Sequence, residues 1–241
     1  MSERQGHGWW PYLVPYFAFL GAVEISGRLP ESWAPVMLFV KPAVPALLLF
    51  WFASRGAYPE LRGFSLRPSG VMADVLVGVA LAILWMAPFI LFPAIRPDTS
   101  GGFDAAILGA DRSTLALVVR MLGFATVTPV FEELFIRGFV MRYAEVYNRS
   151  GDFRDIPIAH FTWRSFISTV VVFTMGHLGW EYSVAVVWIV LTNLWFYYRR
   201  HLMSVIIVHA VTNYAILIFA ILGSDFFRNE AGEPLSLWFF V

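Results

Sequence analysis

Long apolar runs, separated by short polar segments, dominate the chain. A transmembrane helix needs about 20 mostly apolar residues, because that length crosses the hydrocarbon core of a bilayer. Seven segments fit this pattern, although the fourth is long enough to extend past the membrane and the fifth and sixth are short. They are Trp10–Ser26, Trp33–Ala53, Val71–Ile95, Thr114–Tyr143, Ser165–Leu178, Ser183–Tyr198 and Met203–Leu222. The pattern predicts an all-α, polytopic transmembrane helix bundle of about seven spans, within a range of six to eight.

Composition supports this prediction. Of the 241 residues, 59% are hydrophobic and 14% are charged, whereas a soluble domain has about 25% charged residues. The mean hydropathy is +0.67. We therefore expect an integral membrane protein embedded in a lipid bilayer. The formal net charge is zero, which gives no sign of nucleic-acid binding. The absence of cysteine excludes disulfides, thiol nucleophiles and thiolate metal ligands.

The chain shows no internal repeat, low-complexity tract or linker, so we predict a single domain over residues 1–241. The short polar segment Met1–Gly8 leads into the first apolar run without a small-residue cleavage site. We therefore expect a retained first helix, not a removed signal peptide. Gly123 and Pro129 interrupt the fourth span, which leaves an additional split or re-entrant helix open.

Arginine positions predict the orientation of the bundle. Cytoplasmic loops of membrane proteins are enriched in basic residues. With the N-terminus in the cytoplasm, the segments on the inner side carry Arg4, Arg55, Arg62, Arg67, Arg142, Arg149, Arg154, Arg164, Arg199 and Arg200. The segments on the outer side carry only Arg28, Arg96, Arg112 and Arg228. The pattern predicts a cytoplasmic N-terminus and an external C-terminus.

Ionisable residues within the apolar segments mark the candidate chemistry, because such residues are unfavourable in a bilayer and usually functional. The fourth segment contains Glu132, Glu133 and Arg137. Glu133 and Arg137 are four residues apart and lie on one helix face, so they can pair. Glu132 lies about 100° around the helix from Glu133. We therefore expect one carboxylate to neutralise the arginine while the other remains available as a base.

Two histidines on later segments have the same four-residue spacing to a neighbour. Phe173 precedes His177, and we expect its ring to hold the orientation of the imidazole. His209 precedes Asn213 on the last segment, and both side chains can donate hydrogen bonds. Two donors on one helix face are suited to stabilising an oxyanion.

Each of these residues also has a purely structural interpretation. A single intramembrane histidine or asparagine is often a hydrogen bond between helices, and a glutamate–arginine pair one turn apart is more often structural than catalytic. For five other polar residues in or near spans we expect only interhelical pairing or snorkelling to the interface. These are Glu24, Lys41, Asp74, Arg120 and Asn193, of which Asp74 is expected in the first turn of its helix.

The combination is more specific than its parts. Glu-Glu-x-x-x-Arg at residues 132–137, Phe-x-x-x-His at 173–177 and His-x-x-x-Asn at 209–213 follow one another on three apolar segments. This set resembles the CAAX-protease and bacteriocin-processing family, whose eukaryotic relative is the Ras- and a-factor-converting enzyme. The resemblance covers about half the chain and implies a catalytic core at approximately 114–222. It implies an intramembrane endopeptidase of the glutamic type, without a metal or other cofactor, that acts on a membrane-associated protein or peptide.

The resemblance also implies a role for each motif residue. Glu132 and His177 would activate a water, His209 and Asn213 would form the oxyanion hole, and Glu133, Arg137 and Phe173 would support the site. The run Phe153–Trp163 and the Trp-Trp-Pro-Tyr near the start are similar to the exosortase-associated branch of the family. That branch implies a bacterial inner (cytoplasmic) membrane.

Three points stay open at this stage. Zinc held by Glu132, His177 and His209 is an alternative, and so is a non-enzymatic membrane scaffold or immunity protein. The sequence contains no readable substrate code, including whether the substrate is lipidated. The depth of His177 is also unexplained, because it lies near the far end of the fifth segment, whereas Glu132 and His209 are expected nearer the cytoplasmic side.

Overall fold

The computed structural model describes residues 8–97, 102–223, 226–228, 232 and 234–241. It confirms an all-α bundle with seven helical segments. Apart from one isolated bridge between Arg228 and Pro234, the described residues form no β-structure. Six of the segments are single helices: α1 (Trp10–Arg28), α2 (Ala34–Ser54), α3 (Pro68–Leu91), α7 (Trp163–Met175), α8 (Tyr182–Arg199) and α9 (Leu202–Gly223).

The remaining segment, Ala110–Tyr143, is one continuous helical rod, which we call the central rod. It contains α4 (Ser113–Leu122), α5 (Thr128–Glu133) and α6 (Met141–Tyr143), joined by π-helical turns at Gly123–Val127 and Leu134–Val140. Gly123 and Pro129 therefore do not split the rod, and the additional helix that the sequence left open is not found there. Instead, the helix stays continuous through two π-helical turns, which are wider than α-helical turns.

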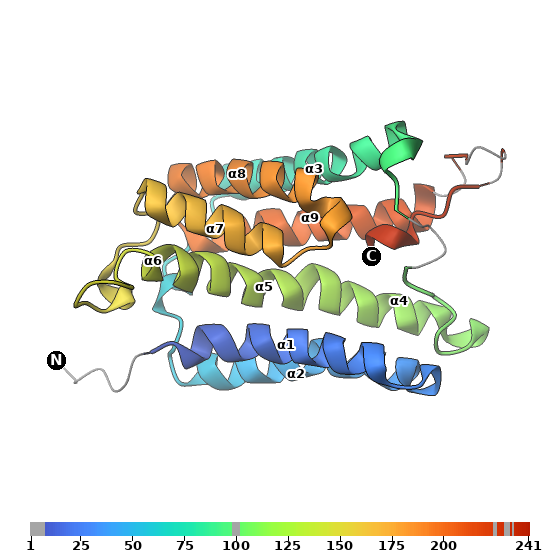
Figure 1. The fold of residues 1–241 in the computed structure, drawn as a ribbon, viewed down its shortest axis with the longest axis horizontal. Helices are drawn as coiled ribbons and strands as arrows, with labels where there is room; N and C mark the ends of the chain where they lie inside the picture. Colours follow the sequence, from blue (N-terminus) through green and yellow to red (C-terminus); the bar gives the residue numbers. More distant parts are fainter. Residues whose placement is uncertain (1–7, 98–101, 224–225, 229–231, 233) are drawn as a thin grey trace.

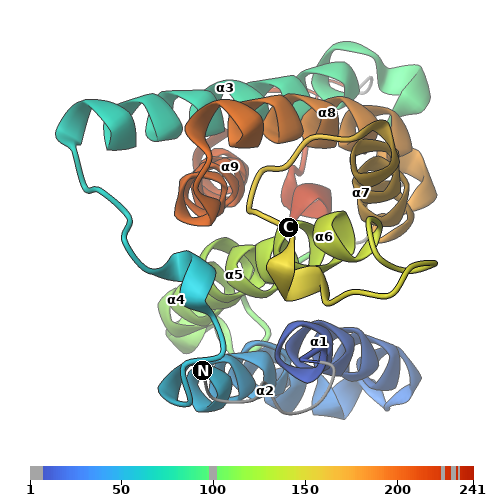
Figure 2. The ribbon, with the colours of Figure 1, turned by 90° about the vertical axis from the view of Figure 1, so that its left-hand side faces the viewer.

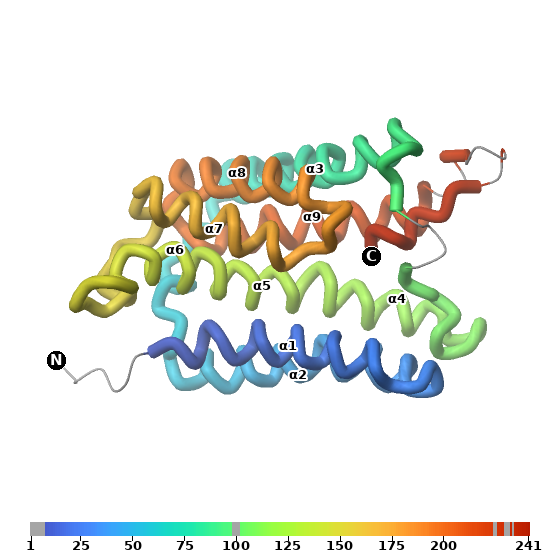
Figure 3. Tube along the Cα trace, viewed as in Figure 1, coloured from blue at the N-terminus to red at the C-terminus, as the bar shows by residue number. Residues whose placement is uncertain are grey.

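The helices run side by side along the long axis of the molecule and alternate in direction (Figures 1 and 3). Viewed end-on, α1 and α2 form one side of the bundle, α3 and α8 form the opposite side, and the central rod and α9 lie between them (Figure 2). This arrangement places the rod and α9, which carry two of the three motifs, in the interior.

Because the helices alternate, the connecting loops gather at two ends. One end, which we call the arginine-rich end, carries loops and adjoining helix ends with Arg55, Arg62, Arg67, Arg149, Arg154, Arg164 and Arg200. The loops and helix ends at the opposite end carry Arg28, Arg96, Arg112 and Arg228. Arg4 lies outside the described residues. The fold thus separates the two sets of arginines as the sequence predicted, while the side of the membrane that each end faces stays a prediction.

The lengths of the helices suit a membrane. Four are long and apolar enough to cross one by length and composition alone: Glu31–Ser54, Pro68–Leu91, Ala110–Tyr143 and Leu202–Gly223. Large apolar side chains such as Phe50, Leu76 and Ile83 are more than half exposed in the middle of helices. A soluble protein rarely exposes such a surface, but a bilayer would cover it.

Small residues let α3 and α9 approach closely. A Cβ atom added at Gly78 would lie 2.7 Å from the backbone oxygen of Val208, so only glycine fits there. The hydroxyl of Thr212 donates to the Gly78 carbonyl at 3.1 Å. This close contact between small residues is typical of membrane helices, and it holds the part of α9 that carries His209 and Asn213.

Buried polar residues outside the motifs mostly connect helices, as expected. Asp74 accepts hydrogen bonds from Trp195 at 2.9 Å and from Arg199 at 3.0 Å, and so joins α3 to α8. It lies in the second turn of its helix, not the first, because α3 begins at Pro68, earlier than predicted. Asn193 donates to Thr169 at 2.9 Å, from α8 to α7.

Candidate active site

A cavity of about 500 Å³ lies inside the bundle. The four residues that were expected to be catalytic line it, Glu132, His177, His209 and Asn213, and so does the supporting residue Phe173. The cavity lies between the central rod, α7 and α9, which carry the three motifs, and residues of α1, α2, α3 and α8 also contribute to its walls.

The two neighbouring glutamates face different surroundings. The side chain of Glu132 is 19% exposed and lines the cavity. The side chain of Glu133 is fully buried behind it and forms an ion pair with the equally buried Arg137. The i, i+4 spacing therefore produces the pair that the sequence predicted, and it leaves Glu132 as the carboxylate that a ligand can reach.

His209 stands between the two carboxylates. Its Nδ1 atom lies 2.9 Å from Glu133 Oε1, and its Nε2 atom lies 3.7 Å from Glu132 Oε2. The Glu133 carboxylate can only accept, so Nδ1 carries the proton of this hydrogen bond. The sequence did not predict this contact, because the two residues lie 76 positions apart.

The buried charges behind the cavity are further connected. Arg137 donates to the hydroxyl of Thr192 on α8 at 2.6 Å, and its guanidinium carbon lies 5.9 Å from the centre of the Trp188 ring. The Trp188 ring in turn packs against His209, with 4.7 Å between ring centres. Arg137, Glu133 and His209 thus form a chain of contacts that fixes the imidazole from behind.

Asn213 is held by a backbone carbonyl of the central rod. In the first π turn, the N–H of Thr128 bonds to the carbonyl of Gly123. The next carbonyl in this register belongs to Phe124 and would pair with the N–H of residue 129, but Pro129 has none. The Phe124 carbonyl instead accepts a hydrogen bond from Asn213 Nδ2 at 2.8 Å.

His177 reaches the cavity because α7 ends early. The helix begins at Trp163, near the arginine-rich end, and has 13 residues, which is about 20 Å. His177 follows in the next turn and therefore lies partway along the bundle, not at its far surface. This resolves the difference in depth that the sequence left unexplained.

The orientation of His177 is fixed by its neighbours. Its Nδ1 atom donates to the Phe173 carbonyl at 2.8 Å, which leaves Nε2 with a free lone pair in the neutral ring. Its ring centre lies 4.4 Å from that of Phe173 and 5.3 Å from that of Trp85. Phe173 therefore packs against the imidazole as expected. In the described structure, no hydrogen bond or ion pair joins His177 to Glu132.

The sequence analysis missed four residues that line the cavity or support it: Lys41, Trp85, Arg120 and Trp188. The tryptophans were not distinguishable from the aromatic residues that gather at membrane interfaces. For Lys41 and Arg120 only interhelical pairing or snorkelling was expected, but both line the cavity. The only indication in the sequence was that each is a charged residue within an apolar run.

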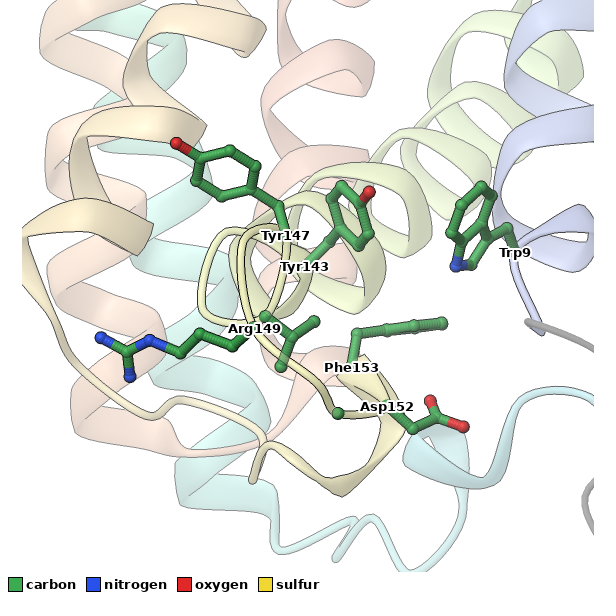
Figure 4. Close-up of a pocket in the computed structure, with 8 residues that line it drawn as sticks. Trp9, Tyr143, Tyr147, Arg149, Asp152 and Phe153 are labelled. Atoms are coloured by element: carbon green, nitrogen blue, oxygen red, sulfur yellow. The ribbon is translucent and has the colours of Figure 1, made fainter.

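A second pocket, of about 270 Å³, lies near the arginine-rich end. Figure 4 shows its lining by Trp9, Tyr143 and Phe153, with the guanidinium of Arg149 extending away from them. The ring of Tyr12 packs edge-on against Phe153 at 5.5 Å. The sequence runs Trp9–Tyr12 and Phe153–Trp163 therefore meet here, and they have a packing role. The pocket contains none of the motif residues.

The three residues considered as zinc ligands, Glu132, His177 and His209, are not arranged as a metal site. Within the described part of the chain, no group of three or more His, Asp or Glu side chains has a geometry that could hold a metal ion. Both ring nitrogens of His209 face carboxylates, and His177 directs one nitrogen to a backbone carbonyl.

Comparison with known proteins supports the resemblance that the motifs indicated. Residues 114–215, less than half of the chain, match the model of a family described as Rce1-like, type II CAAX prenyl endopeptidase Rce1-like. All seven motif residues lie within the matched region. No curated protein and no solved structure matches the chain.

Proposed function

Because residues 114–215 form an Rce1-like CAAX endopeptidase domain, we propose that this integral membrane protein hydrolyses a peptide bond by means of a water activated by Glu132 and His177. The substrate is a membrane-associated protein or peptide, since the site lies inside the bundle. The observation that carries the proposal is that the two glutamates have different partners. Glu133 is ion-paired with Arg137 and hydrogen-bonded to His209, whereas Glu132 lines the cavity.

Water activation follows from the two groups that face the cavity. Glu132 takes a proton from the water as general base, while the free Nε2 atom of His177 accepts a hydrogen bond from the remaining O–H and so orients the attacking oxygen. The oxygen adds to the carbonyl carbon of the substrate. When the tetrahedral intermediate collapses, the C–N bond breaks and the protonated Glu132 returns its proton to the leaving amine. No covalent enzyme intermediate forms, which is the glutamic-type mechanism.

The oxyanion hole is formed by His209 and Asn213 in this proposal. Asn213 has a second amide hydrogen that the Phe124 carbonyl does not use. His209 donates its Nδ1 hydrogen to Glu133, so donation to an oxyanion from Nε2 requires the doubly protonated ring. Glu133 and Arg137 support the site by holding this imidazole, and Phe173 holds His177.

The cellular setting is also a proposal. We place the protein in a bacterial inner membrane with the N-terminus in the cytoplasm. The segregation of arginines to one end of the bundle supports the orientation. The similarity of two sequence runs to the exosortase-associated branch supports the bacterial membrane.

The test compares three membrane proteomes, from cells that carry the wild-type protein, Glu132→Gln or Glu24→Gln, with the proteome of cells that lack the protein. Glu24 is the matched control, because its exposed carboxylate pairs with Arg28 on the surface of α1. New peptide termini should appear with wild type and Glu24→Gln and disappear with Glu132→Gln. The same termini in all three samples would contradict the role of Glu132. If no termini depend on the presence of the protein, a scaffold function would replace the protease.

A further inference from the structure

A second carboxylate lines the same cavity as Glu132. It belongs to Glu181, which follows His177 by four residues in the connection between α7 and α8. Because α7 ends partway along the bundle, this connection is set back from the end opposite the arginine-rich end (Figure 1). Glu181 belongs to none of the three sequence motifs, and the proposed hydrolysis does not use it.

Only one oxygen of this carboxylate has a partner in the described part of the chain. Glu181 Oε2 accepts a hydrogen bond from the Leu178 N–H at 3.0 Å. No hydrogen bond or ion pair among the described residues involves Oε1. Lys41 of α2 and Arg120 of α4 line the same cavity, but neither forms an ion pair with Glu181 there. The carboxylate therefore keeps one acceptor oxygen for a ligand.

Glu181 lies close to the groups that are proposed to act on the peptide bond. Its hydrogen-bond partner Leu178 is the residue that follows His177. The carboxylates of Glu132 and Glu181 lie close enough to repel each other. A ligand that contacts Glu132 is therefore within the electrostatic reach of Glu181.

The surroundings of Glu181 suit a positively charged ligand. A carboxylate inside a membrane protein is unfavourable unless it pairs with a cation or faces a substrate path. A cation beside Oε1 would form a charge-assisted hydrogen bond and reduce the repulsion between the two carboxylates.

Aromatic rings next to this position add to the attraction, because the faces of such rings attract cations. Trp85 and Phe240 both line the cavity. The ring centre of Trp85 lies 5.3 Å from that of His177, and the ring centre of Phe240 lies 6.5 Å from that of Trp180, the neighbour of Glu181. The ligand chemistry that fits is an ammonium or guanidinium group.

We propose that Glu181 is a specificity-determining residue, whose free carboxylate oxygen binds a cationic group of the substrate near the cleaved bond. The cationic group is the side chain of a lysine or arginine, or the free N-terminus of the peptide. This inference rests on the proposed function, because it assumes that a peptide occupies the cavity.

The experiment measures peptide binding to the purified full-length Glu132→Gln protein in a nonionic detergent. It needs no hydrolysis, so it separates failure of this inference from failure of the proposed catalysis. The first probe pair is the C-terminal amides of acetyl-Ala-Ala-Lys-Ala and acetyl-Ala-Ala-Gln-Ala, which reports a basic side chain. The second pair is tetraalanine amide with a free N-terminus and the same peptide with an acetylated N-terminus, which reports a terminal amine.

In at least one pair the cationic peptide should bind about tenfold more tightly than its neutral partner, as expected for a charge-assisted contact. Adding Glu181→Gln should remove this preference. Adding Glu31→Gln is the matched control and should keep it, because Glu31 is exposed in the connection between α1 and α2 and does not line the cavity.

Equal binding of cationic and neutral peptides in both pairs, including no binding of either, would overturn the proposal. A preference that survives Glu181→Gln would do the same. Without a peptide, Glu181→Gln should melt at the temperature of its parent, since the glutamine oxygen can still accept from the Leu178 N–H. A large drop in melting temperature would assign Glu181 a structural role and count against the inference.

Discussion

The Nδ1 atom of His209 lies 2.9 Å from Glu133 Oε1, so a glutamate that the sequence connects only with Arg137 also holds an imidazole of the cavity. This hydrogen bond joins α9 to the central rod. Glu133 therefore has two partners, one for each carboxylate oxygen, and it is fully buried. A change at Glu133 should affect the fold and the site together.

The two neighbouring glutamates should respond differently to the same change. Glu133→Gln leaves Arg137 charged and unpaired and weakens the contact with His209. Loss of one partner of a buried pair destabilises by about 3 kcal/mol or more, so expression and melting temperature should fall and activity with them. Glu132→Gln should keep the melting temperature and abolish cleavage. Melting curves and turnover on an identified substrate check this, and a stable, inactive Glu133→Gln beside an unstable Glu132→Gln would reverse the assignment.

Pro129→Ala should reduce activity without loss of stability. Alanine supplies the N–H that proline lacks, so the Phe124 carbonyl gains a partner within the rod and competes for it with Asn213. Alanine also favours helix more than proline does, so the melting temperature should not fall. We expect turnover to decrease toward that of Asn213→Ala, which should lose about a hundredfold.

Pro15→Ala is the matched control for this prediction, because Pro15 also lies inside a helix but does not line the cavity. It should leave turnover unchanged. Full activity of Pro129→Ala would mean that the carbonyl of Phe124 does not position Asn213.

Gly78→Ala should destabilise the bundle. The new methyl group would lie 2.7 Å from the Val208 carbonyl oxygen, and α3 and α9 would have to move apart. Overpacking of this kind destabilises by about 1–3 kcal/mol. Gly21→Ala is the control, because a methyl group there meets nothing within 4 Å. Thermal unfolding in detergent should show a lower midpoint for the first variant only, and equal midpoints would show that the helices adjust freely.

Purified protein should contain no stoichiometric zinc, and chelators should leave its activity intact. Among the described residues, no group of three or more His, Asp or Glu side chains is arranged so that it could hold a metal ion. Elemental analysis of the wild type and of His209→Ala tests this. Bound zinc that is lost in the variant would favour a metalloprotease.

Reporter fusions test the orientation of the bundle. Fusions at Arg67, Arg154 and Arg200 should read as cytoplasmic, and fusions at Asp104 and at the C-terminus as external, because arginines favour the cytoplasmic side. A cytoplasmic C-terminus would be inconsistent with seven spans.

The parts of the site that the sequence predicted are local. Hydropathy locates the helices, and the four-residue spacing pairs Glu133 with Arg137 and Phe173 with His177, since both depend only on neighbours along one helix. Contacts between distant residues were not predictable in this way. The bond from His209 to Glu133 depends on how α9 packs against the rod, and the early end of α7 has no strong sequence signal.

The entry of α1 and α2 into the cavity wall was missed for a related reason. These helices carry no motif, and for Lys41 of α2 the sequence indicated only interhelical pairing or snorkelling to the interface. Similarly, Pro129 suggested a break in the rod, but its actual effect is to free one carbonyl for Asn213. Both outcomes depend on tertiary packing, which periodicity does not report.

The short α7 has a consequence for the surrounding lipid. Its exposed stripe of Ile167, Val171 and Met175 offers an apolar wall of only about 20 Å, whereas a bilayer has a hydrocarbon core of about 30 Å. Acyl chains beside this wall must compress, at a fraction of a kcal/mol per Å of mismatch. We therefore expect the bilayer to be thinner beside α7, with the headgroups of one leaflet nearer to His177. The thickness of the host membrane should then affect how easily water reaches the site.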